Sequence, residues 1–78
     1  MAKSKEVIDK RIQKICDKIK KLRLAKGYKS YENFAFDNEI NRVQYWRMEK
    51  GNNFNMTSLL KILDIHKLTL GEFFKDIE

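Results

Sequence analysis

Four closely spaced side chains between positions 42 and 47 carry groups that can recognise the base edges of double-stranded DNA. Arg42 and Arg47 can each donate a pair of hydrogen bonds to a guanine, and Gln44 can pair in the same way with an adenine. Val43 can contact the methyl group of a thymine. The alternative is that these residues form an ordinary solvated helix surface, and this stretch alone does not decide between the two.

Two short helices are expected to position these side chains. Asn41 can cap a helix over residues 41–49, and Ser30 can cap an earlier one, because their side-chain oxygens can accept from the free amides of the first turn. The turn-forming residues 37–39 separate the two helices. Two helices joined by about four residues form a helix-turn-helix, here over residues 30–51.

The second helix is predicted to have one apolar face and one polar face. The apolar residues with the spacing of a core-facing side are Ile40, Tyr45 and Met48. The four candidate base-reading residues then lie on the outer side, together with Trp46. Trp46 can contact DNA or a partner protein, or it can brace a neighbouring helix.

Several further segments lie at fixed distances from this motif. They are Leu22-Arg23, Lys26-Gly27-Tyr28-Lys29-Ser30, Phe34-Ala35, Ile40-Asn41, Met48-Glu49-Lys50-Gly51 and Leu70-Gly71-Glu72-Phe73-Phe74. In that order and without a gap, they resemble the Cro/repressor-type (XRE-family) helix-turn-helix DNA-binding domain from Ile19 to Phe74. The resemblance implies an all-α, compact five-helix fold and a transcriptional regulator that reads the major groove of DNA.

The resemblance also implies particular contacts. Lys50 and Asn52 match positions that approach the DNA backbone, and Tyr31 stands where relatives often place a DNA-contacting Gln. A tyrosine can donate its hydroxyl to a phosphate but cannot make the paired bonds of an amide. Glu39 stands where the family usually has glycine, so the turn is expected to strain either Glu39 or Asn38.

Arg23 and Glu49 match family positions that form a partly buried ion pair between the first helix and the end of the recognition helix. The planar fork of an arginine can meet a carboxylate through two hydrogen bonds. The alternative is an exposed pair that adds little to stability.

Composition limits the classes of function. The chain has 78 residues, 36% of them charged, a net charge of +6 and one cysteine. This size allows one small core, and the basic charge favours a polyanionic partner, although solubility alone could explain it. We expect no enzyme activity, cofactor, metal, small-molecule ligand or membrane segment, and a cytoplasmic location of bacterial or phage type, nucleoid-associated when bound.

The first helix is expected to extend further toward the N-terminus than the resemblance requires. Its apolar stripe is Ile8, Ile12, Ile15, Ile19 and Leu22, and Gly27 would end it after about Lys26. Residues 1–6 are predicted to be a flexible N-terminus and residues 7–78 one domain. Ile8 and Ile12 could form a dimer contact, since a homodimer is expected at least on DNA, or they could pack on the C-terminal Phe73, Phe74 or Ile77.

The remaining elements are two C-terminal helices. Asn55 can cap a helix from Met56 to about His66, and Thr69 opens a capping box with Glu72. His66 and Cys16 are interpreted as packed residues rather than a ligand and a nucleophile. The predicted core is Ile15, Ile19, Leu22, Tyr28, Phe34, Ala35, Ile40, Tyr45, Met48, Leu59, Ile62, Leu63, Leu68, Leu70 and Phe73.

The function predicted from the sequence is therefore sequence-specific DNA binding by a small transcriptional regulator. The alternative is a protein-interaction module of antitoxin or phage accessory type, which would use the same helix against a partner and bind DNA weakly without regard to sequence.

Overall fold

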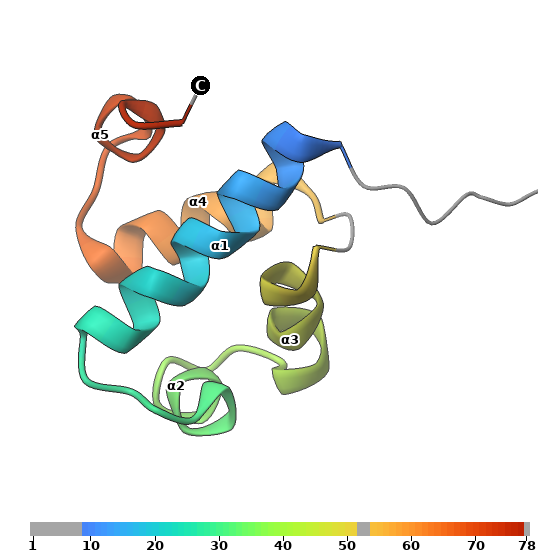
Figure 1. Ribbon diagram of the computed structural model, residues 1–78. Helices are drawn as coiled ribbons and strands as arrows, with labels where there is room; N and C mark the ends of the chain where they lie inside the picture. The colour runs from blue at the N-terminus through green and yellow to red at the C-terminus, as the bar shows by residue number, and fades with distance from the viewer. Residues whose placement is uncertain (1–8, 52–53, 78) are drawn as a thin grey trace, which may run out of the picture.

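A computed structural model describes residues 9–51 and 54–77 of the chain. These residues form five helices and no strand, which confirms the predicted all-α fold (Figure 1). In chain order the helices are α1 (Lys10–Ala25), α2 (Tyr31–Asp37), α3 (Arg42–Lys50), α4 (Met56–His66) and α5 (Leu70–Phe74). None of the helices in the described ranges is long and apolar enough to cross a membrane.

Each helix begins at a side-chain cap. The capping residues are Asp9, Ser30, Asn41, Asn55 and Thr69, and each accepts a hydrogen bond from a backbone amide of the first turn. Glu72 also accepts from the Thr69 amide at 2.9 Å, which completes the capping box. The four caps predicted from residue 30 onward are thereby confirmed. The predicted flexible N-terminus, residues 1–6, lies outside the described residues, as does Ile8.

Left-handed backbone at four positions separates the helices. Gly27 (φ 100°) and Gly51 (φ 94°) follow α1 and α3, and glycine adopts this conformation without steric cost. Glu39 and Lys67 take it as well, each at φ 58°. For Glu39 this matches the expected strain in the helix-turn-helix turn, while the neighbouring Asn38 keeps a φ of −105°.

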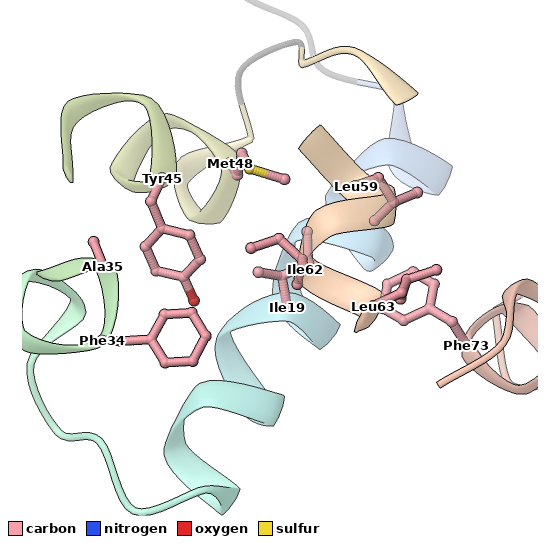
Figure 2. Close-up of a cluster of buried hydrophobic side chains, with 9 residues drawn as sticks. All are labelled: Ile19, Phe34, Ala35, Tyr45, Met48, Leu59, Ile62, Leu63 and Phe73. Atoms are coloured by element: carbon pink, nitrogen blue, oxygen red, sulfur yellow. The ribbon is translucent and has the colours of Figure 1, made fainter. Parts of the chain in front are cut away.

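The core lies where the first four helices meet, and α5 covers one end of it with Phe73. Figure 2 shows its buried side chains: Ile19, Phe34, Ala35, Tyr45, Met48, Leu59, Ile62, Leu63 and Phe73. The Phe34 ring contacts the Tyr28 ring edge-on, at 5.3 Å between centroids, and lies 5.0 Å from the Tyr45 ring. It also stacks on His66, at 5.5 Å between centroids. Phe34 therefore joins α2 to α3 and to the end of α4.

The C-terminal helix is held to α1 through Lys18. Its Nζ donates a hydrogen bond to the Phe73 carbonyl at 2.6 Å and lies 5.2 Å from the centroid of the Phe73 ring. The same Nζ is 3.7 Å from an Asp76 carboxylate oxygen. A cation that contacts a carbonyl, a ring face and a carboxylate at once fixes the position of a helix only five residues long.

The predicted core was wrong at Leu70, and it left out Cys16. Leu70 was predicted to be buried but is 43% exposed, because it is the first residue of α5 and that short helix buries only Phe73. Cys16 was placed beside the apolar stripe but is fully buried. On α1 the buried residues are Cys16, Ile19 and Arg23, whereas Ile12, Ile15 and Leu22 are half-buried. The inner face of α1 is thus rotated by about one residue from the predicted stripe.

Candidate nucleic-acid interface

The turn between α2 and α3 is fixed by hydrogen bonds. The Ile40 amide donates to the Ala35 carbonyl at 2.8 Å, and the Asn38 side chain donates to the Phe34 carbonyl at 2.8 Å. Lys61 on α4 donates its Nζ to the Glu39 carbonyl at 3.1 Å. These bonds satisfy the end of α2 and set the direction in which the chain enters α3. Residues 30–51 therefore form the two packed helices that the sequence predicts.

The two faces of α3 differ as the sequence pattern indicates. Tyr45 and Met48 are buried against the core, and Ile40 before the helix is half-buried. The exposed side chains are Arg42, Val43, Gln44, Trp46 and Arg47, with Val43 51% exposed. The four candidate base-reading residues are thus all exposed to solvent on α3.

Two of the four candidate residues are held by a neighbouring helix. The Nη1 of Arg42 donates to Glu32 on α2 at 2.7 Å, and the Nε2 of Gln44 donates to the Ser58 hydroxyl on α4 at 3.2 Å. Neither partner was identified from the sequence. Glu32 and Arg42 are ten positions apart, and Gln44 and Ser58 are fourteen apart, so no local spacing rule connects them.

The other outer residues of α3 include Arg47 and Trp46. Gln44 and Arg47 line an open hollow with Phe54 and Asn55. Trp46 is 39% exposed, and the Nζ of Lys50 lies 5.8 Å from the centroid of its ring, within cation–π range. The indole is therefore part of the outer surface and is not enclosed by the core.

The candidate phosphate-binding residues have different surroundings. Lys50 is exposed at the end of α3, whereas Tyr31 is half-buried and its side chain packs against the core. Asn52 lies outside the described residues. Of these three, Lys50 is the residue that the structure places at the rim of the exposed α3 surface.

The ion pair between Arg23 and Glu49 is present and buried. The Nε and Nη2 of Arg23 donate to the two carboxylate oxygens of Glu49 at 2.7 and 3.0 Å. The side chains of Arg23 and Glu49 are only 5% and 6% exposed. Nη1 donates to the Tyr28 and Lys29 carbonyls at 2.8 and 2.7 Å. The Glu49 carboxylate raises the pKa of Arg23, so the guanidinium stays charged. This one side chain joins α1, the segment before α2 and the end of α3.

The structure gives Cys16 no features of a nucleophile. Its side chain is fully buried, and burial raises the pKa of the Cys16 thiol. A reactive cysteine needs the opposite, a lowered pKa and solvent access. Cys16 therefore packs as a small core residue, as the sequence indicates.

The chain shows clear similarity to a curated relative. The control protein C.MunI from Mycoplasma sp is 40% identical to this chain over 63 residues, which cover 80% of this chain and 85% of the relative. No protein family model matches the chain, and no solved structure does. The aligned length spans most of both proteins, so the similarity extends well beyond a single motif. This chain belongs to the family of the control protein C.MunI.

Proposed function

We propose that this protein binds double-stranded DNA sequence-specifically as an XRE-type transcriptional regulator, with α3 in the major groove. The observation that carries the proposal is the outer face of α3, where Arg42, Val43, Gln44 and Arg47 are exposed together. An α-helix fits the major groove, and these side-chain types can distinguish base pairs there. A relative named a control protein supports a regulatory role.

Electrostatics supports the same proposal. A net charge of +6 on a chain of 78 residues attracts a polyanion, and Lys50 and Arg47 lie in the last turn of α3. Lys50, with Tyr31 and Asn52, is assigned to phosphate contacts. Phosphate contacts hold the helix in register but carry no sequence information, so the specificity is assigned to the four side chains on α3.

A homodimer is part of the proposal. One helix with four base-reading side chains covers only a few base pairs, and two copies related by a two-fold axis would read a longer, symmetric site. Ile8 and Ile12 stay candidates for the contact. Ile12 is half-buried in the monomer, which leaves part of its side chain available.

The test begins with selection of duplexes that the wild-type protein enriches from a random DNA pool. The affinity of Arg42→Ala is then measured for the enriched duplex and for a scrambled one. Loss of a bidentate base contact should cost roughly 1 to 3 kcal/mol on the enriched duplex and much less on the scrambled one. Equal losses on both duplexes would reassign Arg42 to a backbone contact.

Lys75→Ala provides the matched control, because it removes the same charge at an exposed position. Lys75 follows α5, and Figure 1 draws α5 and α3 on opposite sides of α1. Lys75→Ala should weaken binding to the enriched and the scrambled duplex slightly and equally. Enrichment of no sequence by the wild-type protein would contradict the proposal and favour the protein-interaction alternative.

A further inference from the structure

We propose that Glu32 determines the DNA specificity of this protein by holding Arg42 for base recognition and opposing binding through phosphates alone. This inference rests on the proposed function. Glu32 is the second residue of α2 and Arg42 the first residue of α3, so their contact at 2.7 Å spans the two helices of the motif. Glu32 is 51% exposed and Arg42 is 65% exposed.

The contact is poorly explained as a support for the fold. Both side chains are largely solvated, and an ion pair at such a site adds little to folding stability. The fold already has a buried counterpart in the Arg23–Glu49 pair, which joins α3 to α1. The position of Glu32 is significant for another reason, because it places a carboxylate next to the surface assigned to a polyanion.

The geometry leaves the base-reading edge of Arg42 free. The contact with Glu32 uses Nη1, and within the described residues no partner is found for Nε or Nη2. A guanidinium has its donors in a planar fork, so an arginine held at Nη1 can still present Nε and Nη2 to two acceptors. Guanine offers such a pair, O6 and N7, in the major groove. Holding a long, flexible side chain before binding reduces the entropy that it loses on the DNA.

The charge of Glu32 acts on every DNA sequence alike. A carboxylate within a Debye length of the backbone, about 8 Å at physiological ionic strength, repels phosphates whatever the bases are. It also neutralises Arg42, which would otherwise be free to bind a phosphate. Only a duplex with the correct base recovers this lost attraction, through the paired hydrogen bonds to Arg42. A repulsive element of this kind raises specificity by weakening the wrong complexes.

The test compares the wild-type protein with Glu32→Gln, Arg42→Ala and the double variant. Each is titrated with the duplex enriched by the wild-type protein from a random pool and with its scrambled version, over a range of salt concentrations. Glu32→Gln should raise the affinity for the scrambled duplex by roughly fivefold, the scale of one exposed charge pair. Its salt slope on that duplex should grow by about 0.9, since Arg42 becomes free to neutralise one more phosphate. The ratio of the two affinities should therefore fall.

The double variant separates this mechanism from a general charge effect. Without Arg42, the change Glu32→Gln should leave the ratio of affinities unchanged. Asp76→Asn is the matched control, because it removes an exposed carboxylate that is also paired with a cation, Lys18. Asp76 follows α5, which Figure 1 draws on the opposite side of α1 from α3. Asp76→Asn should shift both affinities by the same small factor. The melting temperature of Glu32→Gln should stay within a few degrees of wild type, since the pair is solvated.

Two results would overturn the inference alone. One is that the wild-type protein enriches a sequence, but Glu32→Gln shifts the affinities for the enriched and the scrambled duplex by the same factor. The other is a fall in the ratio that persists when Arg42 is absent. If the wild-type protein enriches no sequence, the proposed function and the inference are both overturned.

Discussion

At the scale of single residues, Glu39 has the conformation that is hardest to explain by its own preference. Its φ is 58°, a region where a residue with a Cβ atom is strained. The surrounding bonds hold it there, because the Ile40 amide closes the turn on Ala35 and Lys61 donates to the Glu39 carbonyl. Both bonds use the backbone of the turn, so the side chain of Glu39 is not needed for them.

Glu39→Gly should therefore stabilise the protein. Removing the Cβ atom relieves a cost of about 1 kcal/mol, part of which is offset by the greater freedom of glycine in the unfolded chain. Urea unfolding measures the change. Glu39→Ala is the control, since it removes the carboxylate but keeps the strain, and it should bring no such gain. A clearly lower melting temperature for Glu39→Gly would show that the turn needs the glutamate.

His66 is the residue that should make stability depend on pH near neutrality. It stacks on Phe34, and within the described residues its Nε2 is buried without a hydrogen-bond partner. Burial, followed by a smaller effect of the Lys26 cation, lowers the pKa of His66 from its ordinary value of 6.5. The unfolded chain then binds a proton more readily than the folded chain does.

The free energy of unfolding should accordingly fall as the pH drops through about 6.5, until the lowered pKa of the folded protein is passed. Chemical unfolding at a series of pH values between about 7 and 5 measures this slope, above the range in which ordinary carboxylates titrate. His66→Phe keeps an aromatic ring on Phe34 and removes the titration, so its slope should be smaller. An unchanged slope in that variant would assign the pH dependence to other groups.

At the scale of the helices, the position of α3 depends on the buried pair of Arg23 and Glu49. The bidentate contact joins the end of α3 to α1, and the third nitrogen of Arg23 satisfies the carbonyls of residues 28 and 29 before α2 begins. The Arg23 side chain thus contacts both α3 and the segment that leads into α2. Changes at Arg23 should affect the orientation of α3 although Arg23 is remote from the exposed face.

Glu49→Ala should destabilise the protein by roughly 3 kcal/mol, because it leaves the Arg23 guanidinium buried without its counter-ion. Arg23→Ala should cost at least as much, since the carbonyls of residues 28 and 29 also lose their donor. A double-mutant cycle by urea unfolding measures the coupling. The exposed pair of Arg11 and Asp9 gives the comparison, and Arg11→Ala should change stability little. Absence of coupling between Arg23 and Glu49 would contradict this account.

The helix boundaries could be predicted from the sequence because they depend on neighbouring residues. Ser30, Asn41, Asn55 and Thr69 cap amides within three positions of themselves, so the signal is local. The packing face of α1 could not be fixed in this way. Arg23 is polar and would be assigned to the surface by periodicity alone, yet Glu49 brings it inside and the face turns with it.

In the candidate site, the exposure of the side chains was predictable from the sequence, but their hydrogen-bond partners were not. Periodicity placed Arg42 and Gln44 on the outer side of α3, and both are exposed. Their partners Glu32 and Ser58 could not be predicted, because each contact depends on how two helices are placed relative to one another. The resemblance supplied the pairing of Arg23 with Glu49, which no spacing rule connects.

At the scale of the whole molecule, a small basic domain presents one polar helix face from a rigid support. The buried residues of α1, α2 and α4 lie against the inner side of α3, and the charged side chains lie mainly on the surface. This division leaves the outer face of α3 free to carry specificity. The net charge of +6 agrees with the proposal that DNA is the partner.

The most direct test of this account is methylation interference on the duplex that the wild-type protein enriches. Dimethyl sulfate modifies guanine N7 in the major groove and adenine N3 in the minor groove, so the pattern reports which groove the protein occupies. We expect methyl groups on particular guanine N7 atoms to block binding, and we expect Arg42→Ala to become insensitive to at least one of them. Interference confined to adenine N3, or none at any guanine, would contradict the placement of α3 in the major groove.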